Sequence, residues 1–469
     1  MHPTTRAVRR YHDLLAETDA AALSAELEAQ QVERGVTFGG RPVCSVLRPH
    51  FLHPRDFATI ARATEAVVGA VHTIYAAMRA GRLDMAALLH LSEAEEAILA
   101  VPERYGRPDA STRMDAFFHP GERPGEGEVR FLEYNAESPG GIAFGEVLGE
   151  IFLEQAPMRR FRREFAVRTA PLRALVYDTL VACYRDWAAA TGITPHDPPA
   201  VAIVDWREAR TANEFVLSAE VFEARGSPVV ICDPDELAYA GDRLVAREMP
   251  VDIVYKRVVV DELIARAGTL QALVAHPLVR ADRDGAVCVV NGLGVQALYS
   301  KAFFAQATDE RTAGLLGPAE AEAVRRHVPW TRVVAERRTR VGGREVDLVE
   351  HVRAEREGLV LKPVKSYGGR GVVLGWETGQ GDWERAIEAA LDEPTIVQRR
   401  VPVPRELFPV YDGGLELAGR FVDVDPYVWR GREVHHAGVR LGTGPVLNVT
   451  AGGGSATPLF LVEAVHAAG

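Results

Sequence analysis

Apolar residues in the first hundred positions recur at the three- and four-residue spacing of amphipathic helices. Leu14, Leu15, Leu23 and Leu27, with polar residues between them, are typical of this pattern. The spacing predicts helices over three ranges, residues 6–33, 56–80 and 84–100.

The pattern changes after residue 110, where polar and apolar residues begin to alternate. The segments 112–118 (TRMDAFF) and 129–135 (VRFLEYN) both alternate, as half-buried strands do. The connection between them, HPGERPGEGE, is rich in glycine and proline, so we expect the two strands to pair as a hairpin.

Helices and strands alternate through the middle of the chain. Helical spacing covers about 142–190, and the stretch 191–199 is a candidate domain boundary. A strand at 201–204, a helix at 211–224 and a strand at 229–232 form a βαβ unit, which predicts a parallel sheet. Further elements are predicted as strands at 251–255, 287–290, 395–401, 421–429 and 434–441, and as a helix at 383–391.

A glycine-rich stretch at 359–375, LVLKPVKSYGGRGVVLG, stands out in the last third of the chain. Short apolar runs flank the glycines, which predicts two strands joined by a loop. Glycines let successive N–H groups form a nest for phosphate oxygens, and cations lie beside them. An ordinary hairpin with a basic tip explains the same pattern, so it does not decide alone. The residues concerned are Gly368, Gly369, Gly371, Lys362, Lys365 and Arg370.

Composition limits the kind of protein. A chain of 469 residues exceeds one ordinary core, so two or three domains are expected. The net charge of −11 (54 basic minus 65 acidic residues) argues against a nucleic-acid partner, which needs a basic surface. The four cysteines lie far apart without metal spacing, and the sequence has neither an apolar signal core nor an 18-residue apolar run. We therefore expect a cytoplasmic protein with reduced thiols and no membrane partner.

The predicted hairpin carries a candidate metal site. On the expected pairing, Arg113 and Asp115 share one face of the first strand, and Glu133 and Asn135 share one face of the second. Oxygen-bearing side chains on adjacent strands can hold Mg²⁺, which takes one or two carboxylates together with substrate phosphates. The alternative is a charged solvent face. The strand runs into the tight turn at 139–141, however, and functional sites gather at such turns.

A second glycine pattern, NGLGVQA at 291–297, offers a different interpretation. GxGxxA can mark dinucleotide binding, which would favour an NAD-dependent oxidoreductase. The stretch opens no complete βαβ unit, and a second strand ending in an acid about 20 residues on is missing. The NAD enzyme is therefore the weaker alternative.

Five stretches together resemble circularly permuted ATP-grasp ligases, akin to the synthetase domain of glutathionylspermidine synthetase. In this family the acids that bind metal precede the lysines that bind nucleotide, as they do here. The resemblance implies a mixed α/β and α+β chain with a circularly permuted ATP-grasp fold and a Rossmann-like pre-ATP-grasp βαβ domain. The stretches are RMD at 113–115 with FLEYNAESPGG at 131–141, NGLGVQALYSKAFFA at 291–305, LKPVKSYGGRGV at 361–372, VQRRVPVP at 397–404, and AGVRL at 437–441 followed by GGGSATPLFLV.

The resemblance implies a division of the chain and a set of site residues. Residues 1–150 would hold N-terminal helices and the metal-ligand hairpin, 151–295 the pre-ATP-grasp domain, and 296–469 the nucleotide-binding subdomains. ATP would be bound by Lys301, Lys362, Lys365, Gly368, Gly369 and Gly371, with Gln398 to Val401 meeting adenine largely through backbone groups. Mg²⁺, as two ions, would be bound by Asp115, Glu133 and Asn135, and Arg113 and Arg440 would steady a phosphoryl group or reacting carboxylate. Arg399 and Arg400 stand where relatives often have a glutamate, so side-chain contacts at this hinge depart from the family pattern.

The implied activity is an ATP- and Mg²⁺-dependent ligase that joins a small-molecule or peptide carboxylate to an amine through an acyl phosphate. This chemistry depends on positioning and charge neutralisation and needs no protein nucleophile. The sequence has no convincing Ser-His-Asp or Cys-His signature, which agrees with that expectation. The main alternative is a non-catalytic ATP-binding sensor or complex-forming protein. Loss of a metal ligand or phosphate lysine would mark it, and none is lost here.

Overall fold

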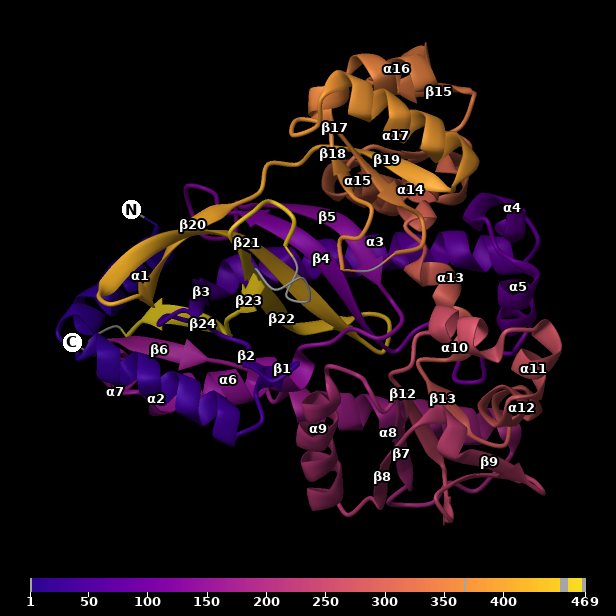
Figure 1. The fold of residues 1–469 in the computed structure, drawn as a ribbon, viewed down its shortest axis with the longest axis horizontal. Helices are drawn as coiled ribbons and strands as arrows, with labels where there is room; N and C mark the ends of the chain where they lie inside the picture. The colour runs from indigo at the N-terminus through magenta and orange to yellow at the C-terminus, as the bar shows by residue number, and fades with distance from the viewer. Residues whose placement is uncertain (1, 367, 448–453, 466–469) are drawn as a thin grey trace.

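The computed structural model describes residues 2–366, 368–447 and 454–465. Figure 1 shows three lobes, a large one at the left, a small one at the upper right and a third at the lower right. Tyr367 and residues 448–453, which belong to two of the stretches named above, lie outside the described residues. No helix of the described chain is long and apolar enough to cross a membrane.

An antiparallel sheet forms the middle of the large lobe. Its strands follow the order β23-β22-β21-β4-β5, and β20 also pairs with β21. The end of β21 pairs with the start of β4, so a hairpin from the first third of the chain and strands from its last part share one sheet. The strands are β4 (Ser111–His119), β5 (Glu128–Asn135), β20 (Arg405–Tyr411), β21 (Leu415–Trp429), β22 (Glu433–Gly442) and β23 (Gly454–Ala456).

The long helix α3 (Pro54–Arg79) packs against this sheet and builds the core of the large lobe. Ile60, Val67, Val71 and Ile74 follow the helical spacing and are 0% exposed, so one face of the helix is fully buried. The other helices of this lobe are α1 (Pro3–Ala16), α2 (Ala20–Glu33), α6 (Ile142–Glu154) and α7 (Ala156–Phe161). The helices α4 (Met85–Leu89) and α5 (Glu93–Leu99) lie at the right of Figure 1 instead, where α4 contacts α14 (Ala302–Thr308) and α5 contacts α11 (Leu270–Ala275). A short hairpin is formed by β1 (Thr37–Phe38) and β2 (Arg41–Pro42).

Two of the predicted helices are each divided in the structure. Asp19 accepts hydrogen bonds from Ala21 N and Ala22 N and so begins α2, which separates it from α1. Ser92 forms a capping box with Glu95 and begins α5, which separates it from α4. The helical spacing over 6–33 and 84–100 is confirmed, and polar capping residues divide each of these two ranges into two helices.

A small sheet joins elements from both ends of the described chain. Its order is β3-β24-β6, with β24 (Leu459–Ala464) parallel to β3 (His50–Leu52) and antiparallel to β6 (Phe165–Arg168). The strand β6 interrupts the region 142–190, for which the sequence predicted helices alone.

The third lobe contains the parallel sheet that the βαβ pattern predicts. Its order is β13-β12-β7-β8 and all its pairs are parallel. The strands are β7 (Val201–Val204), β8 (Val229–Cys232), β12 (Ile253–Lys256) and β13 (Cys288–Val290), beside the antiparallel strands β9 (Leu237–Ala240), β10 (Arg243–Ala246) and β11 (Met249–Pro250). The helices are α8 (Leu172–Thr191), α9 (Ala212–Ala224), α10 (Val260–Ala267), α11 (Leu270–Ala275) and α12 (Pro277–Asp284).

The small lobe contains an antiparallel sheet that packs against helices, among them α16 and α17 (Figure 1). Its order is β14-β19-β17-β18. The elements are β14 (Thr331–Val333), β15 (Arg338–Val341), β16 (Arg344–Asp347), α16 (Leu348–Ala354), β17 (Leu359–Pro363), β18 (Val373–Leu374), α17 (Gln380–Asp392) and β19 (Thr395–Arg399). The connection from the third lobe consists of α13 (Gln296–Tyr299), α14 (Ala302–Thr308) and α15 (Pro318–His327).

Candidate functional site

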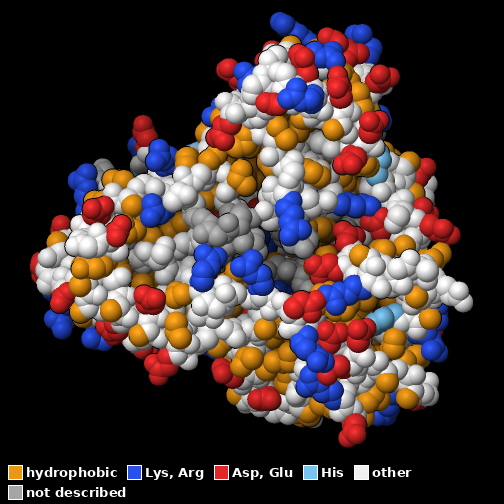
Figure 2. Space-filling model, in the orientation of Figure 1, with side chains coloured by type: hydrophobic (Ala, Val, Ile, Leu, Met, Phe, Trp, Pro, Cys, Tyr) orange, Lys and Arg blue, Asp and Glu red, His pale blue; other side chains and the backbone are white. Residues whose placement is uncertain are grey.

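A cleft lies between the small lobe and the antiparallel sheet of the large lobe. Its volume is about 150 Å³, and it is lined by strands β4, β5, β17, β19, β21 and β22 together with the glycine loop. Figure 2 shows this face hollowed where the lobes meet, with Lys and Arg side chains around the hollow. The predicted site residues that line it are Asp115, Glu133, Lys301, Lys362, Gly368, Gly369, Gln398, Val401 and Arg440.

The register of the β4–β5 hairpin matches the sequence prediction. Asp115 lies opposite Glu133, and Arg113 lies opposite Asn135. Because directly opposed residues of an antiparallel pair project to the same side, the four side chains form one polar group. Asn135 Nδ2 donates to Asp115 Oδ1 at 2.7 Å, which holds two of the predicted metal ligands in contact.

Two arginines bind the carboxylate of Asp115, one at each oxygen. Arg113 Nε donates to Asp115 Oδ1 at 2.8 Å, and Arg440 donates to Asp115 Oδ2 at 2.6 Å. Burial alone would raise the pKa of Asp115, but the two guanidinium groups outweigh it and hold that pKa well below its ordinary value. Asp115 is therefore a carboxylate at neutral pH. Arg113 contacts Asp115 but is not among the described residues that line the cleft.

Two further aspartates, which the sequence interpretation missed, hold Arg440. Asp423 Oδ2 accepts from Arg440 Nε at 2.9 Å, and Asp425 Oδ2 lies 2.9 Å from the same nitrogen. Both aspartates are 1% exposed. Burial raises the pKa of Asp425 well above its ordinary value, so three acids and two arginines can share this small volume. The alternation F-V-D-V-D at 421–425 was the available signal, because aspartate at every second position of an apolar strand is unusual.

The two predicted phosphate lysines approach the cleft from the opposite side. Lys301 lies between α13 and α14, and its Nζ is 3.4 Å from Glu133 Oε2 and donates to Ser366 O. Lys362, on β17, donates to Gln398 Oε1 at 2.9 Å. Burial lowers the pKa of Lys362, while the negative charge of Glu133 partly opposes this change. Cations on one wall thus face carboxylates on the other.

The glycine loop closes one end of the cleft. Its flanking strands β17 and β18 pair antiparallel, as predicted. Gly368 (φ +69°) and Gly369 (φ +72°) adopt the left-handed conformation that favours glycine and line the cleft. A Cβ atom at Gly369 would lie 2.8 Å from Val446 Cγ1, so a side chain there would need the adjoining segment to move.

Four predicted site residues do not line the cleft in the part of the chain that the structure describes. Arg113 and Asn135 each donate a hydrogen bond to Asp115, which does line the cleft. Lys365 points away: its ammonium binds Glu95 and the carbonyl of His90. Gly371 packs toward Pro363, whose Cγ would lie 2.7 Å from a Cβ at that position. These four are Arg113, Asn135, Lys365 and Gly371.

Apolar side chains make up another part of the cleft lining, here called the apolar wall. Val360, Leu374, Trp376, Val401 and Val403 contribute to it. Apolar side chains suit an aromatic base, whereas the charged residues of the cleft suit phosphates. The guanidinium group of Arg400 stacks on the Trp376 ring, 4.0 Å from its centroid.

The oxygen atoms at the hairpin fit a magnesium site in chemistry. Asp115 and Glu133 line the cleft, and Asn135 lies beside them on the same face of the hairpin. Their carboxylate and amide oxygens are of the hard type that Mg²⁺ prefers, and such an ion takes its remaining ligands from substrate phosphates. The described residues contain no group of three or more His, Cys, Asp or Glu placed to hold a metal ion without such help.

The glycine pattern at 291–297 joins two lobes. Asn291 Oδ1 accepts from Ala110 N and Ser111 N at 2.8 and 2.9 Å, and its Nδ2 donates to Ala136 O at 2.9 Å. The 3₁₀ turn Leu293–Val295 and the four-residue helix α13 follow. A dinucleotide fingerprint would instead lead into a long helix, whose N-terminus receives the pyrophosphate.

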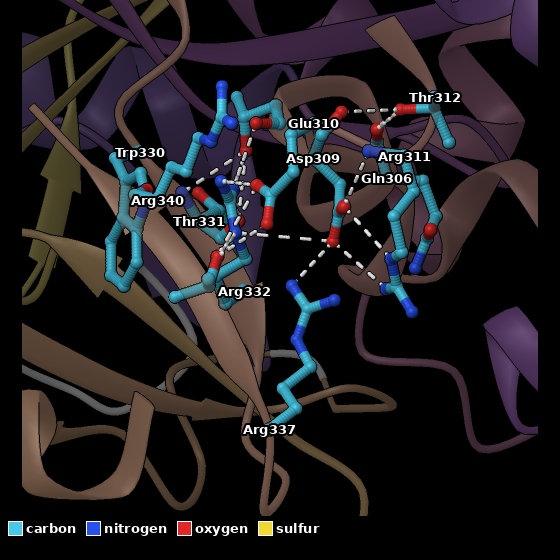
Figure 3. Close-up of polar contacts among 12 residues, drawn as sticks. Gln306, Asp309, Glu310, Arg311, Thr312, Trp330, Thr331, Arg332, Arg337 and Arg340 are labelled. Atoms are coloured by element: carbon cyan, nitrogen blue, oxygen red, sulfur yellow. Dashed lines mark hydrogen bonds and ion pairs between the residues drawn. The ribbon is translucent and has the colours of Figure 1, made fainter. Parts of the chain in front are cut away.

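An ion-pair network fixes the base of the small lobe to α14 (Figure 3). Asp309, directly after α14, accepts from Arg337 at 2.6 Å, and Arg332 of β14 donates to Glu310 at 2.7 Å. Asp309 and Arg332 are 3% and 2% exposed. The network therefore holds the helix that begins beside Lys301 against the sheet that carries Lys362.

Two curated proteins resemble the chain in sequence, although no protein-family model matches it. The Frankia alni protein named "Putative glutamate--cysteine ligase 2-3" is 28% identical over 402 residues, which are 80% of this chain and 42% of that protein. The Frankia casuarinae protein named "Putative glutamate--cysteine ligase 2-2" is 28% identical over 451 residues, 92% of this chain and 48% of that protein. The chain thus spans less than half the length of the curated relatives it matches.

One solved structure matches nearly the whole chain. It is a glutathione synthetase-like effector from Globodera pallida in its apo form, with a TM-score of 0.59 and 10% sequence identity. The match covers 95% of this chain and 98% of that one. The two chains therefore share a fold over nearly their whole length, and the mixed α/β and α+β class that the sequence resemblance implies is confirmed. Strands β4 and β5 from the first third of the chain share one sheet with β21 and β22 from its last part, which agrees with a permuted order.

Proposed function

We propose that the chain is an ATP-dependent carboxylate–amine ligase with a circularly permuted ATP-grasp fold. One observation carries this proposal. Lysines and glycines at positions 301–369 and acids and arginines at 115–133 and 423–440 meet across a single cleft. The arrangement has the charge pattern needed to bind a polyphosphate on one side and its metal ions on the other.

The nucleotide is assigned to the small-lobe side of the cleft. Lys301 and Lys362 would bind phosphate oxygens, with Gly368 and Gly369 covering them. Adenine would lie on the apolar wall and meet the hinge through its backbone. Arg399 N and Arg400 N donate to Trp330 O and Gly358 O at 2.8 Å each. We therefore assign the hinge donor for the adenine edge to Val401 N–H.

Magnesium is assigned to the hairpin side. Asp115, Glu133 and Asn135 would hold two ions, and the ions would supply neutralisation of the phosphate charge. Arg440 lines the cleft while Asp423 and Asp115 fix its Nε and one terminal nitrogen. Arg440 is thus placed to steady the carboxylate or the transferring phosphoryl group, and Arg113 acts on the site through Asp115.

The reaction we propose has two steps. A substrate carboxylate oxygen attacks the γ-phosphorus, the bond to the β-phosphate oxygen breaks, and ADP leaves with the bonding electron pair. The amine nitrogen then attacks the acyl carbon, phosphate leaves, and the nitrogen loses a proton to give the amide. Positioning and charge stabilisation by Lys362 and Arg440 would supply the catalysis, since no protein nucleophile is required.

The relatives suggest which substrates to test first. Both are named as glutamate–cysteine ligases, so we propose amino acids as the carboxylate and amine substrates, with glutamate and cysteine as the first pair. The purified chain would be incubated with ATP, Mg²⁺ and pairs of amino acids, and ADP release and product mass would be measured.

We expect one ADP to be released for each amide formed. The Glu133→Gln variant should release no ADP and form no amide. ATP binding without turnover for any amino acid or small peptide pair would instead support the nucleotide-sensor alternative. No ATP binding at all would contradict the proposed site.

A further inference from the structure

The side chain of Gln398 contacts three elements beneath the cleft. Its Oε1 accepts from Lys362 Nζ at 2.9 Å, and its Nε2 donates to Thr331 Oγ1 at 3.1 Å and to Leu132 O at 3.3 Å. The residue is 2% exposed, on β19 between β17 and β14. The family resemblance assigns this position to adenine through the backbone, so the side chain is available for another role.

The hydrogen-bond partners fix the direction of the amide. Thr331 Oγ1 donates its single hydrogen to Pro329 O at 2.8 Å, so it can only accept from Gln398. Leu132 O is a carbonyl and can only accept as well. The amide nitrogen of Gln398 must therefore face these two oxygens, and its oxygen must face Lys362. If the amide were flipped, its oxygen would face two other acceptors, Thr331 Oγ1 and Leu132 O, and its NH₂ group would face the Lys362 ammonium.

An oriented neutral acceptor suits the lysine of a phosphate site. The lysine side chain is flexible, and a binding site must otherwise overcome the loss of its rotamer freedom when the ligand arrives. The amide oxygen of Gln398 holds the ammonium in place and leaves its positive charge intact. A carboxylate at this position would hold it too, but would cancel the charge that phosphate needs.

We propose that Gln398 is a positioning residue that holds Lys362 ready for the nucleotide. This inference rests on the proposed ATP site. Its link to Leu132 O adds a geometric consequence, because Leu132 precedes Glu133 on β5. The same side chain therefore sets the position of the phosphate lysine relative to the strand that carries a proposed metal ligand.

A double-mutant cycle on ATP affinity tests the proposal. Gln398→Met keeps the length of the side chain and removes the acceptor, and Lys362→Met removes the ammonium. Gln398→Met alone should weaken ATP binding roughly 2- to 12-fold, the range that one typical intramolecular hydrogen bond spans. In the Lys362→Met background the same change should have an effect of less than about twofold, since the group it positions is absent.

A second pair of variants tests the direction of the hydrogen bonds. Thr331→Val removes the hydroxyl that accepts from Gln398, whereas Thr331→Ser keeps it. The valine variant should weaken ATP binding about twofold to fourfold, as a freed amide rotates, and the serine variant should match the parent. Calorimetry at a temperature where every variant is folded gives these ATP affinities. A substitution that only destabilises the fold then lowers the melting temperature but leaves the affinity unchanged.

Two results would overturn the inference. Equal effects of Gln398→Met in the parent and in Lys362→Met would show that Gln398 does not act through the lysine. Equal affinities of the valine and serine variants at position 331 would show that the amide orientation is wrong. Failure of the proposed function is a separate result, because Lys362→Met would then bind ATP as tightly as the parent.

Discussion

Replacing Lys362 with methionine should weaken ATP binding strongly while leaving the fold intact. Methionine keeps most of the length and apolar surface of the lysine stem and removes its charge. The lost interaction is a charge-assisted hydrogen bond to phosphate, about 1.5–3 kcal/mol, which corresponds to roughly 10- to 150-fold in the dissociation constant. The structural loss is smaller, since the lysine donates to Gln398 Oε1 alone in the described contacts. Calorimetry measures the change in ATP affinity, and thermal melting measures the change in stability.

Lys365→Met is the matched control, because Lys365 lies in the same loop but points away from the cleft. Its ammonium binds Glu95, which is 4% exposed. The variant should lose about 1–3 kcal/mol of stability, since a buried carboxylate loses its cation, and should keep the parent's ATP affinity. We thus expect Lys362→Met to lose ATP affinity while keeping its stability, and Lys365→Met to lose stability while keeping its ATP affinity. Parent-like ATP affinity in Lys362→Met, or a large affinity loss in Lys365→Met, would refute the assignment.

The pH dependence gives a second check on Lys362. Burial lowers its pKa below the ordinary 10.5, against the opposing charge of Glu133. The charged form binds phosphate, so affinity is complete below this lowered pKa and falls as the pH rises through it. The decline should begin below pH 10.5 in the parent and be missing from Lys362→Met, whose affinity is low throughout. Identical profiles would show that another group causes the decline.

Three further predictions concern the rest of the cleft. Glu133→Gln should abolish ADP release with little change in melting temperature, because Glu133 is partly exposed; full turnover would refute its role as a metal ligand. Amide exchange across residues 368–372 should slow when ATP and Mg²⁺ are added, because a covering loop becomes ordered over its ligand; unchanged rates would leave an ordinary hairpin tip. Asp423→Asn should lower the free energy of unfolding by about 1–3 kcal/mol and also reduce turnover, since Arg440 loses the oxygen that binds its Nε. Parent-like denaturation and turnover would contradict that role.

The β4–β5 hairpin could be predicted from the sequence, because the two-residue period of a strand fixes which side chains share a face. Side chains alternate between faces, so Arg113 and Asp115 had to share a face, and a Gly- and Pro-rich connection favoured direct pairing. The same reasoning located the two strands around the glycine loop. These inferences need only local pattern and turn chemistry.

Side-chain direction in irregular segments could not be predicted in the same way. Lys365 follows the end of β17, where no period fixes its direction, and its partner Glu95 lies far away in the chain. Asp423 and Asp425 were missed for another reason. Their alternation in a buried strand was visible, but their partners Arg440 and Asp115 become neighbours only when distant strands assemble.

The joining of β21 to β4 has a consequence for how the protein is made. The hairpin of β4 and β5 leaves the ribosome long before β21 exists, so the edge of β4 stays unpaired during most of synthesis. The parallel lobe is complete once β13 has emerged and can fold first, whereas pairing between such distant strands is slow. A nascent chain stalled before Leu415 should therefore hold a folded parallel lobe beside an open strand edge, which is the kind of surface that chaperones bind.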